Sequence, residues 1–408
     1  MNLDYKKLAL MILIAAAVIA LIFLIYFFFV KPFSAPPPAD QEQTAGSDQT
    51  LPTAGQSTGQ TSVIDGISQT FPAGSSQTGA DNVPDGSQPT KQTNTTPLTD
   101  FPVYFAASSN NGDLVYYSSD GKFYRINPNG QVTAFSDKVF HNVSNVVWSN
   151  GKDKAILQYP DGSNIIYDFN QNKQITLQKH WTDFTFSPSD QQIAFKSIGL
   201  DPENRFLAVG DNSGSNLKII ESIGGVENKF QINWSPNNSM IANFIESNGI
   251  NRTEIYFVGL NNENFKSMTV EGRGFEGLWS PDGTAMVYSV YNTSDYTPQL
   301  WISGAGPENI GAGRNVLGLN TWADKCSFSD ATTLYCAVPQ EMPYGAGLES
   351  GLTIGISDDI YKIDLQTGAK QLISGYGDHR IDKIFPLSGG STLLFTDANT
   401  GEIYRVEL

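Results

Sequence analysis

Hydrophobic and polar positions repeat along the last three quarters of the chain in one pattern: an aromatic residue, a short polar turn and an apolar run. The clearest copy is WSPDG at 279–283, followed by AMVY at 285–288. Further copies start at six other aromatic residues, which lie 38 to 57 residues from their neighbours in the series: Phe105, Trp148, Phe186, Trp234, Phe328 and Phe385. The pattern predicts repeated units built from short strands.

The chemistry of the 279–283 copy is that of a tight turn. Pro281 presets φ near −65°, Ser280 and Asp282 can bond to the nearby backbone, and Gly283 relaxes the exit from the turn. The turn therefore joins two antiparallel strands. The run at 285–288 does not alternate between apolar and polar residues, which is typical of a strand covered on both faces.

A period of roughly 40–50 residues made of short strands is typical of a β-propeller blade. One blade cannot bury its faces alone, so the units must stack into a ring. Seven motifs predict an all-β propeller of seven blades. Six or eight blades remain open, because the first and last copies are degenerate. Ile-Tyr patterns predict a third strand in several blades: Asn164–Phe169, Glu254–Val258, Ile360–Asp364 and Glu402–Val406.

The last unit ends just after its third strand, so we expect a strand from elsewhere to close the ring. Val103–Ala106 is one candidate, pairing with the last blade. The same segment fits equally well as the inner strand of the first blade.

The N-terminal part predicts a membrane anchor. Residues 8–30 are 23 residues without a charge, and a helix with a rise of about 1.5 Å per residue would cross a hydrocarbon core of about 30 Å. A cleaved signal peptide is the alternative, although its apolar core is usually only about 7–15 residues long. Lys6 and Lys7 before the span favour a cytoplasmic tail at 1–7 and an extracytoplasmic C-terminal domain. We expect a single-pass protein of the cell membrane.

Residues 31–100 are rich in Ser, Thr, Gln, Gly and Pro, and apolar residues are sparse. Such a segment cannot bury enough apolar surface to offset its ordering entropy, so it predicts a disordered linker. The propeller domain is then expected at 101–408. The formal net charge of the chain is −16, which disfavours nucleic acid as a partner.

The chain has two cysteines, Cys326 and Cys336, on either side of a turn. A simple hairpin would place them opposite each other, with Cα atoms near 4.5 Å apart, within reach of a disulfide. An extracytoplasmic compartment would permit the bond, so we predict a disulfide. The alternative is a pair of small buried residues in a blade strand.

No catalytic, cofactor-binding or metal-ligating residues are predicted. The GRGFEG sequence at 272–277 matches G-x-G-x-x-G, but it precedes a predicted strand and turn, whereas a dinucleotide site needs a helix there. The histidines share no ligand spacing. The acidic turns predicted at Asp358-Asp359 and Asp211-Asn212 could attract cations, but we expect turn chemistry, which is the usual role of such residues.

The WSPDG, WSPNN and FSPSD units resemble the WD40-like (PD40) repeats of TolB-like β-propellers, over about 101–408. The C-terminal units also look like those of membrane-anchored bacterial propeller proteins. The resemblance implies a protein-binding platform in the cell envelope, because TolB-like propellers usually serve in that way, and it carries over no catalytic residue.

The sequence predicts a non-catalytic, surface-displayed binding or scaffold module with a protein partner in the cell envelope. We expect the partner at the funnel mouth or on the longer loops, predicted at Gly199–Ser215, Tyr291–Thr297 and Pro339–Ser357. One alternative is a glycan-active envelope enzyme, which needs carboxylates, Tyr or His converging on the funnel; an apolar, Gly-lined funnel would exclude it. Another is an accessory subunit of a secretion or pilus machine.

Overall fold

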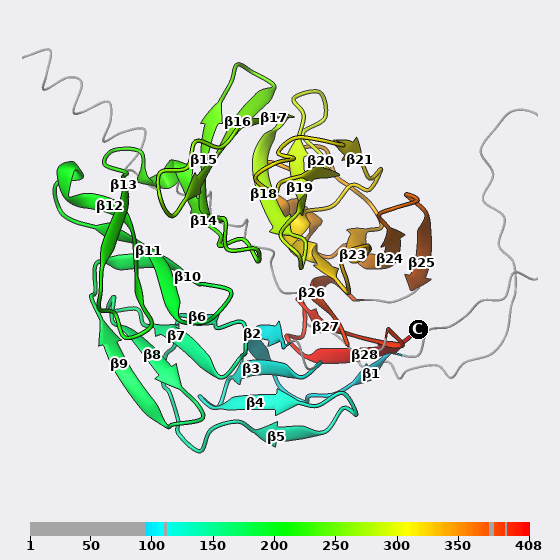
Figure 1. Cartoon of the computed structure of the whole chain (residues 1–408). Coiled ribbons are helices and arrows are strands. Elements are labelled where there is room, and N and C mark those ends of the chain that lie inside the picture. Colours follow the sequence, from blue (N-terminus) through cyan, green and yellow to red (C-terminus); the bar gives the residue numbers. More distant parts are fainter. Residues whose placement is uncertain (1–94, 110–111, 375–378, 388–389) are drawn as a thin grey trace, which may run out of the picture. The chain divides into compact units, whose positions relative to one another are not determined.

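Seven four-stranded antiparallel sheets stand around a central axis in the computed structural model and form a seven-bladed β-propeller (Figure 1). The structure describes residues 95–109, 112–374, 379–387 and 390–408, all within one compact unit. The predicted all-β class and seven blades are confirmed. The predicted helix at 8–30 and nearly all of the predicted linker at 31–100 lie outside the described residues. Over the described ranges, none of the helical segments has the length and apolar character that crossing a bilayer requires.

Blades 1 to 4 each take four consecutive strands, ordered from the innermost strand outward. Blade 1 has β2 (Val103–Ser108), β3 (Leu114–Ser118), β4 (Phe123–Ile126) and β5 (Val132–Ala134). Blade 2 has β6 (Asn145–Trp148), β7 (Lys154–Gln158), β8 (Asn164–Asp168) and β9 (Lys173–Leu177). Blade 3 has β10 (Trp181–Phe186), β11 (Gln192–Ile198), β12 (Arg205–Asp211) and β13 (Lys218–Ser222). Blade 4 has β14 (Phe230–Ile232), β15 (Met240–Ser247), β16 (Arg252–Gly259) and β17 (Met268–Glu271).

Blades 5 to 7 complete the ring. Blade 5 has β18 (Arg273–Trp279), β19 (Ala285–Tyr291), β20 (Pro298–Gly304) and β21 (Asn315–Val316). Blade 6 has β22 (Cys326–Phe328), β23 (Thr333–Pro339), β24 (Asp358–Asp364) and β25 (Lys370–Ser374). Blade 7 has β26 (Ile381–Pro386), β27 (Thr392–Asp397), β28 (Ile403–Glu407) and, outermost, β1 (Thr96–Pro97). Short 3-10 helices connect some of the strands: η2 (Pro202–Asn204), η3 (Glu227–Lys229), η4 (Ala323–Lys325) and η5 (Ser350–Thr353).

The hydrophobic core of the ring consists of seven clusters, and each cluster lies between two adjacent blades. The second strand of each blade contributes side chains to the two clusters that flank that blade. In β19, Tyr288 packs into the cluster shared with blade 4, and its neighbour Val287 packs into the cluster shared with blade 6. Successive side chains of a strand point to opposite faces, so such a strand must be apolar at every position. This is why the apolar runs after each turn do not alternate.

The recurrent serine of the turn motif stabilises the turn through hydrogen bonds of its hydroxyl group. Ser280 is buried, its Oγ accepts from the backbone N–H of Ala285 (3.0 Å), and it donates to Asp282 (2.6 Å). Ser235 accepts in the same way from Met240 N–H (2.9 Å). Ser149 and Ser187 repeat the bond in blades 2 and 3. Each hydroxyl therefore satisfies a donor at the first residue of an apolar strand, or next to it.

The fourth residue of these turns adopts a left-handed backbone. Gly283 has φ of 68°, and Asn238, Asp190 and Lys152 occupy the same region at the equivalent positions. Gly, Asn and Asp tolerate this conformation best. At Gly283 a side chain would also collide, since a Cβ would lie 2.7 Å from the backbone nitrogen of Asn237 in the preceding blade.

The ring closes through β1, whose Thr96 and Pro97 pair with Arg405 and Tyr404 of β28. The prediction that Val103–Ala106 pairs with the last blade is wrong, and the alternative is right: this segment belongs to β2, the inner strand of blade 1. The ring accordingly begins before residue 101, the predicted domain boundary, and takes its closing strand from the predicted linker. The reason is register along the chain, because β2 pairs with β3 on the axis side of blade 1 and is not available to blade 7.

Side chains reinforce this closure. Thr99 Oγ1 accepts from Ile403 N–H (3.0 Å) in a buried position. His379, one of the scattered histidines, lies between Asp397 (Nδ1 to Oδ2, 2.6 Å) and Thr95 (Nε2 to Oγ1, 3.2 Å). Side-chain hydrogen bonds near the two-residue strand β1 thus add to its backbone pairing with β28.

The third strands predicted from the Ile-Tyr patterns are confirmed as β8, β16, β24 and β28. Of the predicted long loops, Gly199–Ser215 is wrong, because it contains β12. The connections at 292–297 and 340–357 are confirmed as loops, the second with η5 inside it.

We predict that Ser280→Ala destabilises the ring by about 1–3 kcal/mol, because the N–H of Ala285 loses its acceptor, the buried hydroxyl of Ser280, in a partly buried position. Urea unfolding of the purified protein measures this. Ser329→Ala is the matched control, since Ser329 starts the equivalent turn of blade 6 and is exposed; it should change stability by less than about 0.5 kcal/mol. Equal losses for both variants would contradict the role given to the motif serine.

Candidate functional site

The first candidate binding feature is a channel along the propeller axis. Its wall is formed by the inner strands of blades 1, 4, 5, 6 and 7, and it encloses a cavity of about 640 Å³. β-Bulges in β2, β18 and β26 decide which side chains enter it. The first paired residues after these bulges are Ala107, Glu276 and Lys383, and all three line the channel. A bulge re-aims a side chain in this way.

Charged groups from three neighbouring blades meet in this channel. Glu276 comes from β18 of blade 5, Asp324 from η4 at the entry to blade 6, and Lys383 from β26 of blade 7. Asp382 lies beside Lys383 and lines a smaller pocket with Glu276 and Asp324. The funnel is therefore not a purely apolar wall, and the condition that would have excluded an enzyme is not met.

The surroundings of the channel raise the pKa of the carboxyl groups of Glu276 and Asp324. Each residue is solvent-accessible through the open channel, yet the surrounding blades bury enough of its environment to disfavour charge. Burial raises the pKa of Glu276 to about 7, and the carboxylate of Asp324 adds to this. Burial also raises the pKa of Asp324, against the opposing effect of the Lys383 ammonium. Glu276 can therefore exchange a proton near neutral pH.

The second feature is a rim of three loops on one face of the ring. We call it the ledge: residues 248–251, 292–297 and 340–357, which join the second and third strands of blades 4, 5 and 6. Because successive strands are antiparallel, all connections of this kind emerge on the same face. The ledge meets the channel, since Ser350 and Thr353 line a pocket of about 150 Å³ together with Glu276 and Asp324.

Hydrogen bonds join the three loops into one surface. Thr293 donates through Oγ1 to Asn251 between blades 4 and 5. Gly345 N–H donates to the carbonyl of Asp295 (3.1 Å), and Gly347 N–H donates to that of Tyr296 (2.6 Å), between blades 5 and 6. Only glycine fits at 347, because a Cβ there would lie 2.7 Å from the carbonyl oxygen of Tyr296.

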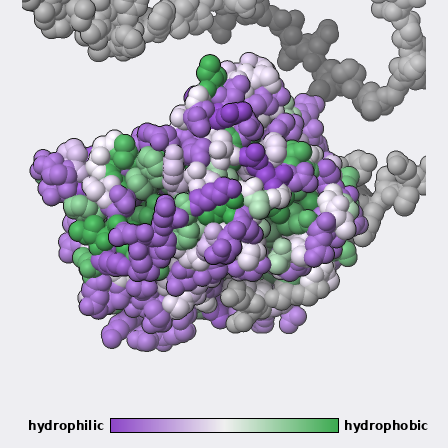
Figure 2. Space-filling view, turned by 45° about the horizontal axis from the view of Figure 1, so that its top comes forward, coloured by the Kyte–Doolittle hydropathy of each residue, from purple (hydrophilic) through white to green (hydrophobic). Residues whose placement is uncertain are grey.

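Large apolar side chains project from this ordered support. Ile250 is 75% exposed, Ile354 70%, Tyr344 69% and Leu348 60%. The ring of Tyr344 makes an edge-to-face contact with that of Tyr296, with ring centroids 5.9 Å apart. Most of the face visible in Figure 2 is hydrophilic, with separate hydrophobic patches between the polar residues. Large apolar side chains exposed on loops that are fixed by hydrogen bonds are candidates for an interaction site.

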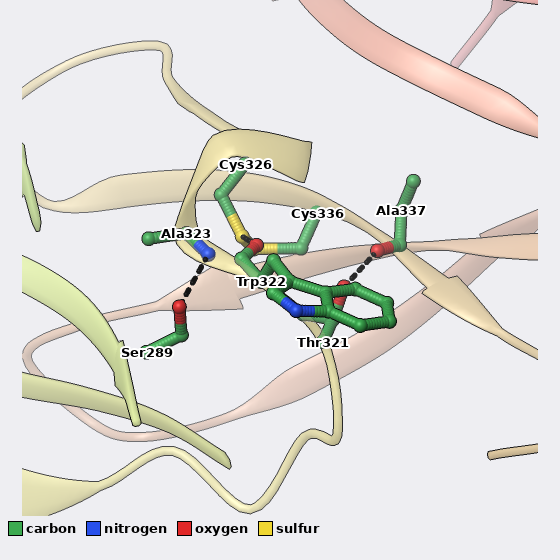
Figure 3. Close-up of a disulfide and its surroundings, with 7 residues drawn as sticks. All are labelled: Ser289, Thr321, Trp322, Ala323, Cys326, Cys336 and Ala337. Carbon is green, nitrogen blue, oxygen red and sulfur yellow. Dashed lines mark hydrogen bonds between the residues drawn. A yellow bond between two sulfur atoms is a disulfide. The ribbon is translucent and has the colours of Figure 1, made fainter. Parts of the chain in front are cut away.

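The predicted cysteine pair lies beside the channel. Cys326 in β22 and Cys336 in β23 are directly opposed, with Cα atoms 4.0 Å apart, and the structure joins them by a disulfide (Figure 3). Cys326 directly follows η4, which carries Asp324. Two hydrogen bonds fix the same segment: Ala323 N–H to Ser289 Oγ of blade 5 (3.2 Å), and Thr321 Oγ1 to the carbonyl of Ala337 (2.6 Å) (Figure 3). The disulfide therefore supports a charged wall of the channel.

The two segments predicted as acidic turns, Asp211-Asn212 and Asp358-Asp359, differ from each other. Asp211 ends β12 and accepts from Ser213 N–H (2.9 Å), which is the predicted turn chemistry. The same prediction is wrong for Asp358-Asp359, which begin β24. Asp358 is buried, forms an ion pair with Lys325 (2.6 Å), and accepts from Ile381 N–H of blade 7 (2.7 Å). Asp358 therefore joins blade 6 to blade 7. Among the described residues no group of three or more His, Cys, Asp or Glu side chains could hold a metal ion.

Sequence reasoning missed the channel residues Glu276, Asp324 and Lys383. Glu276 lies inside the G-x-G-x-x-G match at 272–277, which is the bulged strand β18 followed by a turn and not a nucleotide loop. Gly274 supplies the bulge with φ of 65°. A glycine pair beside a charged residue, just before a blade aromatic, was the available signal for a re-aimed side chain.

Neither protein-family models nor curated protein sequences give a match to this chain. Solved structures give many matches in fold. The β-propeller domain of Cps50 (Swd1) from Myceliophteria thermophila aligns with a TM-score of 0.51 at 10% identity, over 77% of this chain and 99% of that domain. The tricorn protease gives 0.49 at 11% identity, over 76% of this chain and 33% of the protease.

An oligogalacturonate lyase in complex with manganese gives a TM-score of 0.47 at 12% identity, over 78% of this chain and 93% of the lyase. Identities this low show the propeller fold alone. The resemblance to PD40 repeats of TolB-like propellers stays a prediction.

We predict that the carboxyl group of Glu276 titrates with a midpoint near 7, measured by carbon NMR of labelled glutamate side chains, and that Asp324→Asn lowers this midpoint by removing a negative neighbour. Since the folded pKa lies above the unfolded value, stability from the protonated form is lost as pH rises through 7. Glu276→Gln should therefore stabilise the protein at pH 8, and this gain should shrink as the pH falls and vanish below the ordinary glutamate pKa of 4.5. Asp330→Asn, in a distant turn, should leave the midpoint unchanged.

We predict that the protein isolated under oxidising conditions carries no reactive thiol after denaturation, and gains two on reduction. Closing a loop of this size, with a sequence separation of 10, stabilises by about 2–3 kcal/mol through the unfolded state. Cys326→Ser with Cys336→Ser should lower the unfolding free energy by that amount and remove the effect of reductant. A reductant effect that persists in this variant would contradict the assignment.

Proposed function

We propose that this chain is a non-catalytic binding module of the cell envelope, held at the membrane by the hydrophobic segment at 8–30 and displayed outside the cell on the linker at 31–100. In this proposal the propeller binds a protein partner on the face that bears the ledge. The propeller fold supports a binding or scaffold role in general, since rings of blades present loops on a rigid support. The location rests on the sequence pattern alone.

The observation that carries the proposal is the ledge itself. Tyr344, Leu348 and Ile354 are exposed, but their loop is joined to that of blade 5 by two backbone hydrogen bonds. A surface already ordered before binding loses little conformational entropy on association. Exposed tyrosine and large aliphatic residues on such a surface are what a protein interface needs at its centre.

A glycan-active enzyme is the second candidate, and the channel favours it. Glu276 and Asp324 are two carboxyl groups from neighbouring blades, both with raised pKa values. A protonated carboxylic acid next to a second carboxyl group is the arrangement that glycoside hydrolysis uses. If the channel is an active site, Glu276→Gln abolishes turnover of envelope glycans; if the chain is a binder, that variant keeps its partner. An accessory subunit of a secretion or pilus machine would also be a binding protein. A position of its gene among the genes of such a machine would favour that role over a free receptor.

A photo-crosslinking amino acid at position 348, in the full chain expressed in its own cells, tests the proposal. We expect a discrete crosslinked protein from 348 and none from the control position 217. Leu217 is a good control because it is 56% exposed and its loop joins the third and fourth strands of blade 3, on the opposite face of the ring. The same adducts from both positions, or none from 348, would overturn the proposal.

A further inference from the structure

The ledge has a chemical character of its own, apolar and acidic together. Besides its exposed apolar side chains it contains Asp295, Glu341 and Glu349, and none of its three loops contains a lysine or an arginine. An arginine beside it is already engaged: Arg273, at the start of β18, donates to the carbonyls of Gly249 (2.8 Å) and Ile250 (2.6 Å). The three loops therefore present apolar groups together with three carboxylates and no cation of their own. The Arg273 guanidinium keeps its positive charge beside them and offsets one carboxylate, so a net negative charge remains.

This combination disfavours three possible occupants. A membrane surface rich in anionic lipids repels carboxylates, although it would accept the apolar side chains. A second copy of the chain is disfavoured by charge, because the formal net charge of −16 makes two acidic faces repel each other. A small apolar ligand needs a concave site that buries most of its surface, whereas Tyr344, Leu348 and Ile354 project outward.

The remaining partner is a protein surface of opposite charge. Apolar anchors on it would pack between the exposed side chains of the ledge, and lysines or arginines at its rim would face Asp295, Glu341 and Glu349. Complementary charge raises the association rate and rejects acidic competitors, while the apolar centre supplies the affinity. We propose that the ledge docks a protein partner through a surface, helical or extended, that combines large apolar residues with lysine or arginine. This inference rests on the proposed binding function and specifies its partner.

Three synthetic amphipathic peptides of equal length, with Leu/Lys, Leu/Glu and Ser/Lys composition, serve as probes in fluorescence anisotropy with the full chain in detergent. We expect binding of the Leu/Lys peptide, weakening as salt rises, and at least about tenfold weaker binding of the other two. Equal binding of the Leu/Glu peptide, or no binding of the Leu/Lys peptide, would overturn the inference. So would binding to phosphatidylserine vesicles through the ledge.

Matched variants locate the effect. Tyr344→Ser with Leu348→Ser and Ile354→Ser should weaken the Leu/Lys peptide at least about tenfold. Leu217→Ser with Ile219→Ser removes comparably exposed apolar groups away from the ledge and should change nothing. Equal losses in both would mean nonspecific apolar binding and would overturn the inference.

A charge variant tests the second half of the inference. Glu341→Gln with Glu349→Gln removes two charges while a side-chain oxygen remains at 349 to accept from Gly351 N–H (3.1 Å). It should weaken the Leu/Lys peptide by about threefold and flatten its salt dependence. An unchanged salt dependence counts against the inference.

The two proposals fail separately. If crosslinking at 348 captures a partner whose contact surface is acidic, the binding function stands and this inference falls. If the peptides discriminate as expected but 348 yields no adduct in cells, the surface chemistry stands and the envelope-binding function falls.

Discussion

The burial of each blade's second strand between two neighbouring blades is the interaction on which the rest of the structure depends. Tyr288 and Val287 are adjacent in β19, yet they belong to clusters shared with different blades. A strand that is apolar on both faces has no stable solution in an isolated sheet. The same constraint applies around the ring, including the junction of blades 7 and 1, where Phe385 and Tyr116 share a cluster. Stacking of blade 7 on blade 1 is therefore a condition for burying the whole core.

A core of this kind separates stability from function. The recurrent serines, Asp358 and the His379–Asp397 pair are polar, but their contacts satisfy backbone donors or join blades. Binding or catalysis can therefore use only side chains that do not pack in the core. Such side chains come from the inner-strand residues that bulges turn into the channel, such as Glu276, and from the loops on one face of the ring.

The ledge and the channel are two uses of the same rigid frame. The loop at 340–357 belongs to both, since its η5 residues line the channel mouth while Leu348 and Ile354 project outward. A partner on the ledge would lie next to Glu276 and Asp324. Occupation of the ledge would thus change access to the channel, so the two features are best measured in the same protein.

The sequence by itself determined the fold class and most third strands, and it favoured seven blades while leaving six or eight open. It could do so because the turn motif at 279–283 and its copies depend on local backbone conformation. It also placed Cys326 opposite Cys336, since a hairpin fixes its own register. Only the tertiary structure decided which segment closes the ring, and that Asp358 joins blades instead of forming a turn. It alone brought Glu276, Asp324 and Lys383 into one channel and tied Tyr296 to Gly347. These contacts connect residues from different blades, and their geometry comes from the stacking of sheets, which no local pattern encodes.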